Sequence, residues 1–389
     1  MGKWEIVRLG DVFSYIRNGA NIKQNKNVSG YPITRIETIA KGLIDRTKMG
    51  YAGIKKIDSY SDYVLQDGDI LMSHINSVTH LGKVARYKQQ CDEIIIHGMN
   101  LLNLRADNRK IKSLFAYYFF TSYAFKKQLP NITKNSVNQS SFNIIALKDL
   151  QIFLPPIPVQ QKIADVLDRA SAIIEKRKAQ IEKLDLLVKS KFIEMFGNLQ
   201  INNMGWKIKS FSEFAKIDAV MTTEYEKYSH YPHIGIDSIE SGTGELRGYR
   251  TIKQDGVKSG KYIFTSDHII YSKIRPNLNK VALPSFNGLC SADAYPILNN
   301  CSNCDKVFLV HILRSDFFLS HILPFSDRTN FPKVNREQIA KFNMPLPPLE
   351  IQKQFSDLVH IVDKSKLELQ NGLDKLELLY KSLVQKYFT

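Results

Sequence analysis

The sequence predicts an α+β fold in which two mixed domains alternate with two long helices that pair as an antiparallel coiled coil. Three observations support this prediction. A repeat runs through the whole chain, two segments space their apolar residues as long helices do, and the other two segments contain β-branched runs. The repeat divides the 389 residues into mixed domains at 1–153 and 198–345 and helical segments at 154–197 and 346–389.

The two helical segments repeat without a gap at an offset of 192 residues. The match begins with a Leu-Pro-Pro-x-x-x-Gln motif at 154–160 and 346–352, and it continues to Phe196 and Phe388. Such fixed spacing is expected of a rigid helix. The mixed domains repeat more loosely, as loops of unequal length allow.

Each helical segment begins after two prolines, which end the preceding segment in an extended conformation. Apolar residues then follow at steps of three and four, interrupted by Arg177, Lys366 and Gly372. Because each apolar stripe is narrow, each helix needs a second helix to cover it, and the obvious partner is the other one. The residues expected in the helix seam or in partner docking are Ile163, Val166, Ile181, Leu184, Val188, Phe355, Leu358, Leu373, Leu376 and Tyr380.

Each mixed domain combines strand-like runs with an aromatic-rich helical stretch. The runs lie at 33–36, 94–97, 234–236 and 262–270, and they are rich in β-branched residues. The helical stretches lie at 114–129 and 306–321. We expect their aromatic side chains to fill a core rather than to form a stacking platform.

Composition and charge restrict the class of protein. The formal net charge of +16 is concentrated in the mixed domains, with +10 in 1–153 and +4 in 198–345, against +2 and zero in the helical segments. Basic domains favour a polyanionic partner, although a merely soluble basic surface is the alternative. A hydrophobic content of 43% excludes a disordered chain. No apolar run reaches membrane-spanning length, and four scattered cysteines form no disulfide framework, so we expect a reduced, cytoplasmic protein that does not bind membranes.

A polar segment follows the aromatic helix in each mixed domain, at 131–143 and 326–336. Asn and Gln can pair with adenine edges, Arg and Lys with guanine, and Ser or Thr with bases or phosphates. An ordinary solvated loop is the alternative for such a composition. The candidate DNA contacts in these segments are Lys134, Asn135, Asn138 and Gln139 in the first domain and Arg328, Asn330, Lys333 and Arg336 in the second.

A second candidate surface follows a buried-looking strand in each domain, where a turn can present side chains to a groove. The two copies differ at the positions where two domains that recognise different DNA sequences would differ. Neutral drift of a loop gives the same pattern. The candidates are Ser73, His74 and Asn76 in the first domain and Ser272, Lys273, Arg275 and Asn277 in the second.

Motifs for catalysis are missing from the sequence. It contains neither a Gly-rich cofactor loop with an Asp/Asn-Pro-Pro-aromatic tetrapeptide nor a phosphate-binding P-loop. Cys301 and Cys304 form a lone Cys-x-x-Cys without the second pair or spaced histidines that a zinc site requires. We therefore expect a binding protein with no catalytic residues and no metal.

The order, duplication and spacing of these features resemble the specificity subunit of type I restriction–modification systems. The runs 69–73 and 269–276 also resemble parts of that family's target-recognition domains. One departure is that the first domain starts almost at Met1, with no preceding helix.

The resemblance implies that each mixed domain is a target-recognition domain that reads one half of a bipartite site in double-stranded DNA. It implies that the helices set the spacer and dock two modification subunits, which supply S-adenosylmethionine-dependent methylation. Restriction subunits would add ATP- and Mg-dependent translocation and cleavage, so this chain itself binds no cofactor. Two other classes remain open: a stand-alone DNA-modifying enzyme and a coiled-coil scaffold that binds protein.

Overall fold

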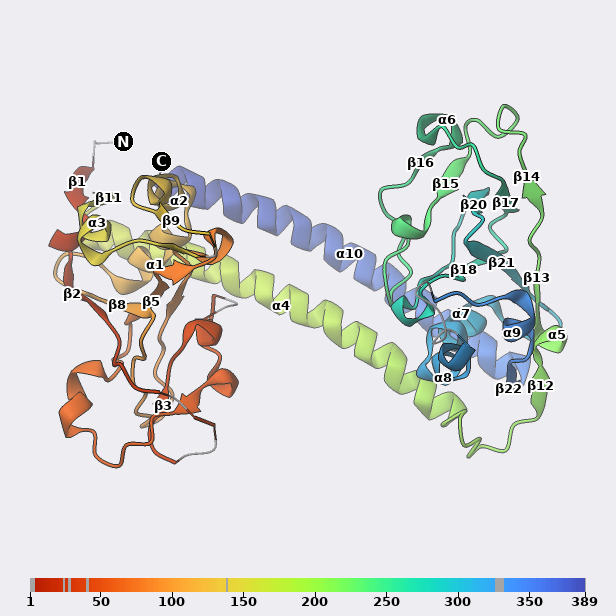
Figure 1. The fold of residues 1–389 in the computed structure, drawn as a ribbon, viewed down its shortest axis with the longest axis horizontal. Coiled ribbons are helices and arrows are strands. Elements are labelled where there is room, and N and C mark those ends of the chain that lie inside the picture. Colours follow the sequence, from red (N-terminus) through yellow and green to blue (C-terminus); the bar gives the residue numbers. More distant parts are fainter. Residues whose placement is uncertain are drawn as a thin grey trace. The chain divides into compact units, whose positions relative to one another are not determined.

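A computed structural model describes residues 4–23, 25–26, 29–39, 42–137, 139–325 and 332–388 (Figure 1). The chain forms two compact units. The first unit contains Met1–Lys178 and Asn371–Thr389, and the second contains Ala179–Gln370. Both boundaries fall inside long helices, so each long helix contributes one part to each unit. The domain limits expected from the sequence stay a prediction.

The first unit is built around an antiparallel four-stranded sheet in the order β2-β8-β5-β7. Its strands are β2 (Phe13–Asn18), β8 (Leu101–Ala106), β5 (Ile70–Ser73) and β7 (Val84–Arg86). The helices α1 (Ser113–Thr121) and α2 (Tyr123–Gln128) contribute buried aromatic side chains to the same core. The aromatic stretch therefore lies in the core, as predicted from the sequence.

Short strand pairs complete the first unit. They are β1 (Glu5–Arg8) with β11 (Gln151–Leu154), β3 (Pro32–Ile33) with β4 (Gly50–Tyr51), and a small sheet of β6 (Ile75–Asn76), β10 (Ser140–Ser141) and β9 (Lys134–Asn135). One more helix, α3 (Ile144–Asp149), follows the small sheet.

The second unit repeats the four-stranded sheet in the order β13-β21-β18-β19. Its strands are β13 (Ala215–Ile217), β21 (Ala294–Asn299), β18 (Ile269–Ser272) and β19 (Val281–Ala282). The helices α7 (Lys306–Arg314) and α8 (Asp316–Ile322) take the place of α1 and α2. This agreement in strand order confirms that the mixed domains are structural repeats.

The second unit also has a five-stranded sheet in the order β14-β17-β20-β15-β16. Its strands are β14 (Met221–Thr222), β17 (Lys261–Phe264), β20 (Gly288–Ser291), β15 (Pro232–Ile234) and β16 (Arg250–Thr251). The remaining elements are β12 (Ile208–Ser210) paired with β22 (Asn343–Pro345), and the short helices α5 (Phe211–Phe214), α6 (Ile252–Asp255) and α9 (Arg336–Ala340).

Several predicted elements are divided in the structure. Each aromatic helix breaks at a serine, Ser122 or Ser315, whose side chain accepts a hydrogen bond from the amide three residues later and so starts a new helix. The run 262–270 forms two strands, β17 and β18, separated by a turn. The run 94–97 forms no strand and makes only isolated bridges at Ile96. The runs 33–36 and 234–236 give way to 3₁₀ turns.

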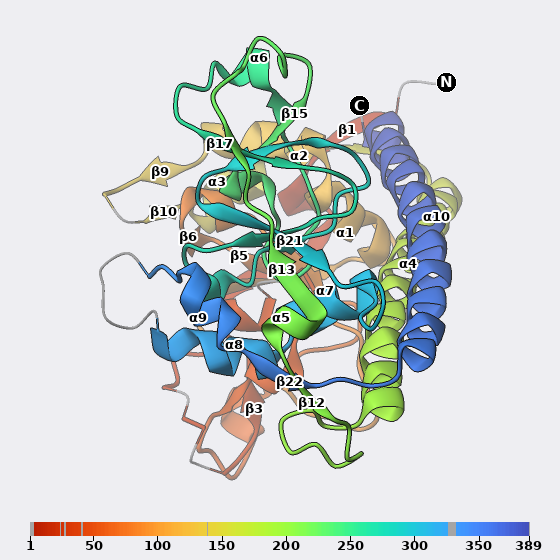
Figure 2. The same ribbon diagram turned by 90° about the vertical axis from the view of Figure 1, so that its right-hand side faces the viewer.

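The two long helices are α4 (Ile157–Phe196) and α10 (Leu349–Phe388), each of 40 residues. In the first unit Ile163, near the start of α4, shares a core with Phe388, at the end of α10. In the second unit Phe196, at the end of α4, contacts Phe355 near the start of α10, with ring centroids 5.4 Å apart. The helices are therefore antiparallel within each unit, as predicted, and they run side by side in both views (Figures 1 and 2).

Among the described residues no single helix is long and apolar enough to span a membrane. Helix α7 and the segment Asp316–Phe325, which are bent by 57° relative to each other, are together long and apolar enough to span a membrane, by length and composition only. Most apolar residues of this pair are buried in the core of the second unit.

Candidate nucleic-acid interface

The two candidate segments of the first unit, treated separately in the sequence, meet in the sheet β6-β10-β9. Asn76 lies opposite Ser140, and Ser140 lies opposite Asn135. A bond from the Ser140 hydroxyl to the Asn135 Oδ1 atom, at 2.7 Å, links two of these strands through their side chains. Figure 2 shows β9 and β10 on the side of the first unit away from α4 and α10. We call this sheet and the described residues that connect its strands, 73–77, 134–137 and 139–141, the first tip.

Exposure separates the residues of the first tip into two groups. Lys134, Asn135 and Gln139 are exposed, and Asn76 is half-buried. The Asn76 side chain accepts a hydrogen bond from the Ser77 amide at 2.8 Å, which fixes its orientation. The exposed group therefore offers amide and ammonium groups to a partner, in keeping with base or phosphate contacts.

Ser73 and His74 lie in the interior. Their exposed fractions are 1% and 7%, and the His74 carbonyl accepts a hydrogen bond from the Phe142 amide at 3.1 Å. Burial lowers the pKa of His74 to about 4, so the ring is neutral near pH 7. This geometry suits residues that hold the two segments together, and a direct contact with DNA stays a prediction for both.

The second unit joins its two candidate segments in the same way. The Lys273 carbonyl accepts a hydrogen bond from the Val334 amide at 2.8 Å, and Ile274 forms an antiparallel bridge with Lys333. The Arg275 amide donates to the Pro332 carbonyl at 2.7 Å. His74 and Phe142 thus correspond to Lys273 and Val334, and we call residues 272–277 and 332–336 the second tip.

Positions within the second tip differ in exposure. Arg275, Asn277, Lys333 and Arg336 are exposed, whereas Ser272 and Lys273 have exposed fractions of 2% and 8%. Arg275 has a φ of 47°, a left-handed conformation that non-glycine residues seldom adopt. Three further candidates, Asn138, Arg328 and Asn330, lie outside the described residues.

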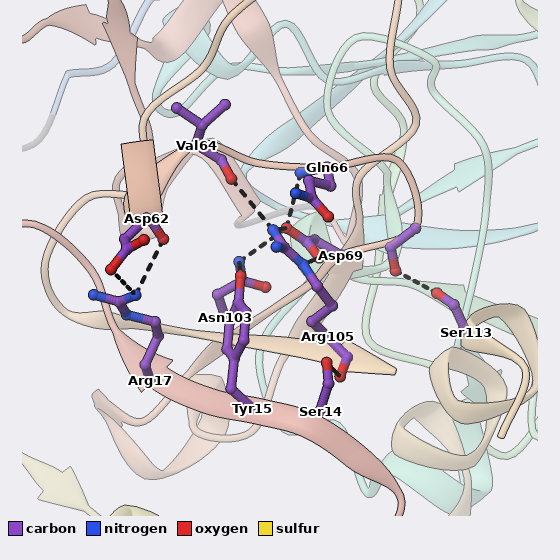
Figure 3. A network of polar contacts seen from close by, with 11 residues as sticks. Ser14, Tyr15, Arg17, Asp62, Val64, Gln66, Asp69, Asn103, Arg105 and Ser113 are labelled. Carbon is purple, nitrogen blue, oxygen red and sulfur yellow. Dashed lines mark hydrogen bonds and ion pairs between the residues drawn. The ribbon is translucent and has the colours of Figure 1, made fainter. Parts of the chain in front are cut away.

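A polar network holds the strand that leads into the first tip (Figure 3). Asp69, which precedes β5, accepts two hydrogen bonds from Arg105 of β8, at 2.8 and 2.7 Å, and one from the Asn103 side chain at 2.9 Å. The Arg105 guanidinium lies 4.7 Å from the centre of the Tyr15 ring of β2. Burial, followed by the nearby Asp69 charge, raises the pKa of Tyr15 to about 12. The network ties three strands together and gives the first tip a rigid base.

The second unit replaces this network with different chemistry. His268 stands where Asp69 stands in the first unit, and its Nδ1 atom accepts a hydrogen bond from the Thr265 amide at 3.0 Å. Its Nε2 atom lies 3.4 Å from the Asp218 carboxylate. The turn before the strand is thus held in both units, by a carboxylate in one and by an imidazole in the other.

A cavity of about 790 Å³ lies beside β9 in the first unit. Asn135, Lys83, Lys126 and Tyr117 contribute to its lining. Neither lysine was singled out from the sequence, because they lie in separate elements that only the fold brings to one place. The cavity gives the first tip a concave flank with basic and aromatic side chains.

The long helices present a second kind of surface. Leu186 and Leu187 of α4 are 62% and 39% exposed, and the residues 192 positions later, Leu378 and Leu379 of α10, are 71% and 56% exposed. Exposed leucine pairs that recur at the repeat offset are typical of protein docking rather than of a solvated face. Of these four leucines, the sequence alone points to Leu379 as a position on or beside the helix seam, and the other three were not singled out.

The ten residues expected in the helix seam or in docking fall into three groups. Ile163, Phe355 and Leu373 are buried, and Val166 is exposed. The half-buried residues are Ile181, Leu184, Val188, Leu358, Leu376 and Tyr380. Ion pairs flank the seam in each unit, between Lys178 and Glu377 at 3.0 Å in the first and between Lys366 and Asp185 in the second. Among the described residues no three His, Cys, Asp or Glu side chains gather as metal ligands.

Comparison with known proteins agrees with this architecture. The family model described as "Type I restriction modification DNA specificity domain" matches residues 1–183 and 203–378. The chain belongs to the type I restriction–modification specificity family. The two matches of this specificity chain each take in one mixed domain and part of one long helix, which is the duplication seen in the fold.

Relatives cover nearly the whole specificity chain. A putative type I restriction enzyme MjaX specificity subunit of Methanocaldococcus jannaschii is 31% identical over 96% of this chain and 91% of its own length. The type I restriction enzyme EcoDI specificity subunit of Escherichia coli is 29% identical over 62% of each chain. The crystal structure of the S subunit of a type I system from M. genitalium has a similar fold, with a TM-score of 0.62 at 14% identity over 99% of this chain and 96% of that one.

Proposed function

We propose that this specificity chain directs a type I restriction–modification complex to a bipartite site in double-stranded DNA, with each unit reading one half. The observation that carries the proposal is the repeated tip. In both units the same main-chain hydrogen bond, from Phe142 to His74 and from Val334 to Lys273, joins a strand end to a polar segment. Exposed amide, ammonium and guanidinium groups at both tips suit contacts with base edges and phosphates.

Within this proposal the chain supplies recognition and no catalytic residue. Its modification subunits would bind S-adenosylmethionine and transfer the methyl group, and its restriction subunits would use ATP and Mg. Tests on the chain with and without modification subunits separate this function from a stand-alone DNA-modifying enzyme. We expect the purified chain alone to transfer no methyl group and the assembled complex to methylate a bipartite motif. Methylation by the chain alone would contradict the proposal.

We propose that the long helices dock two modification subunits. The exposed pairs Leu186–Leu187 and Leu378–Leu379 support this, because the repeat gives two equivalent apolar surfaces, one in each unit. Each surface would take one copy of the same partner. A protein-binding scaffold without DNA recognition would share these surfaces, but its association with duplex DNA would not weaken steeply as salt is raised.

We also propose that the helices set the distance between the two half-sites. Four residues add roughly 6 Å to an α-helix and turn it roughly 40° beyond one full turn. One base pair advances DNA by about 3.4 Å and turns it by about 35°. Four helix-forming residues inserted after Lys178, where one unit gives way to the other, should lengthen the spacer by one or two base pairs. Both half-sites should keep their sequence, as read from the methylated motif in cells, whereas an unchanged spacer in an active complex would contradict this role.

A further inference from the structure

The second tip gathers three cations, two of which lie against the ring of one tyrosine. The Lys273 Nζ atom lies 4.9 Å from the centre of the Tyr295 ring, and the Arg336 guanidinium lies 5.6 Å from the same centre. The Lys333 ammonium lies 3.5 Å from the Asp293 carboxylate, which is the neighbouring acid. These residues come from the end of β18, from β21, from α9 and from the segment before it, so only the fold brings them together.

Lys273 is held in place by its backbone. Its amide donates to the Asp293 carbonyl at 2.9 Å, and its carbonyl accepts from the Val334 amide at 2.8 Å. With an exposed fraction of 8%, its side chain has little of the freedom of a surface lysine. The ammonium is therefore preorganised at the edge of the cluster.

The electrostatics of the cluster favour an anion. Burial, followed by the charge of Lys333, lowers the pKa of Lys273, so its ammonium is less favourable here than in an exposed lysine. Asp293 opposes this shift, but it is one acid among three cations and is 45% exposed. An anion that reached the cluster would relieve the repulsion between the cations.

The first unit has no such cluster at the corresponding positions. His74, Ser141, Ile144 and Leu102 stand where Lys273, Lys333, Arg336 and Tyr295 stand in the second unit, as the shared strand registers show. His74 is neutral near pH 7, since burial lowers its pKa to about 4. The cationic cluster is therefore a property of one tip and not of the repeat.

We propose that Lys273, Lys333 and Arg336 form a site for one or two phosphates of the DNA backbone at the half-site of the second unit. The Tyr295 ring packs against Lys273 and Arg336 and so supports this site. This inference rests on the proposed function, because it names the part of the DNA that this tip contacts. Three crowded ammonium and guanidinium groups match the negative charge of a phosphate, whereas a guanine edge carries no net charge to offset their repulsion. The cluster contributes affinity for DNA and fixes the position of the tip along the duplex. Other residues of the tip read the base sequence.

The test uses the full chain assembled with its modification subunits and a labelled duplex that carries the methylated motif found in cells. The dissociation constant is measured from about 50 to about 200 mM KCl, where each phosphate contact contributes roughly 0.9 to the logarithmic salt slope. Lys333→Gln and Arg336→Gln should each lower the slope by up to this amount, with the methylated motif unchanged. Lys273→Met should do the same, and the two exposed variants keep the test decisive if this buried substitution impairs folding.

Lys258→Gln is the matched control, because it removes an exposed lysine of the same unit outside the cluster. It should leave the slope unchanged. Unchanged slopes in both Lys333→Gln and Arg336→Gln would overturn the phosphate site, and so would an altered base sequence in the methylated half-site, which would indicate base readout. These outcomes differ from a failure of the proposed function, in which the unsubstituted complex would show no preference for the motif.

Discussion

Gln160 and Gln352, 192 residues apart, make the same three hydrogen bonds at the starts of α4 and α10. Gln160 accepts from the Lys112 amide at 2.8 Å and donates to the Lys110 and Pro155 carbonyls at 3.0 and 2.8 Å. Gln352 accepts from the Asp305 amide at 2.8 Å and donates to the Asn303 and Pro347 carbonyls at 3.0 and 2.7 Å. Both side chains are fully buried. The glutamine of the repeated motif thus ties each long helix to the segment that leads into α1 or α7.

Replacing this glutamine should destabilise one unit. Gln160→Leu leaves the Lys112 amide and the Lys110 and Pro155 carbonyls without their partner, and of these only the bond to the Pro155 carbonyl is fully buried. A buried group left unpaired costs about 1–3 kcal/mol. We expect a loss of about 1–3 kcal/mol, measured by hydrogen exchange of the α1 amides, which reports on the first unit. The exposed neighbour provides the control, since Gln161→Leu should change stability by less than about 0.5 kcal/mol. Equal effects of the two substitutions would show that the buried bonds are not responsible.

Gly372→Ala should stabilise the helix pair of the first unit. A Cβ atom at this helical position meets nothing within 4 Å, and alanine favours a helix interior by about 1 kcal/mol over glycine. Gly244→Ala is the contrasting variant, because its φ is +69° and a Cβ atom would lie 1.7 Å from the Val281 carbonyl oxygen. Urea unfolding should show opposite signs, and a destabilised Gly372→Ala chain would contradict the packing described for α10.

The first unit should lose stability as the pH falls from 6.5 towards 4. Burial lowers the pKa values of His74 and His97 to about 4, whereas the unfolded chain takes up these protons near pH 6.5. Because the unfolded state then binds more protons, acid favours unfolding across this window. His74→Leu should reduce the pH dependence of α1 hydrogen exchange, and His80→Leu, at an exposed position, should leave it unchanged. An undiminished pH dependence in His74→Leu would rule out this histidine as a source.

Leu187→Glu and Leu379→Glu should each remove one modification subunit from the complex. Both side chains are exposed, so a charge there costs the folded chain little but is costly within an apolar interface. Native mass spectrometry should show one bound subunit for each single variant and none for the double variant. Leu376→Glu, at a half-buried seam position, should instead lower the stability of the first unit. Full stoichiometry in the double variant would place docking elsewhere.

The sequence was most informative where structure depends on local spacing. The ungapped match between two segments 192 residues apart predicted two long helices, and both have 40 residues and begin just after their proline pairs. Other features depend on register between distant segments. The pairing of Asn76 with Ser140 joins stretches more than 60 residues apart, and no local pattern encodes it. Tyr295 was not predicted as a site residue for the same reason: it comes close to Lys273 only when β21 pairs with β18.

The breaks at Ser122 and Ser315 show a further limit. Apolar periodicity continues across both positions, so the pattern favours one helix, but each serine caps a new one. A serine followed by helical sequence on both sides is compatible with either outcome, and tertiary packing decides between them. Burial had a similar effect at Ser73 and His74, whose polarity suggested a surface although the fold places both inside.

The most direct test of independent half-site reading exchanges one mixed domain. Residues 1–153 are replaced by the corresponding domain of a specificity subunit with a different target, and the methylated motif is read from cells that also carry the modification subunits. If each unit reads one half-site from its own tip, one half of the motif changes to that of the donor while the other half stays the same. A motif in which both halves change together would contradict independent reading by the two units.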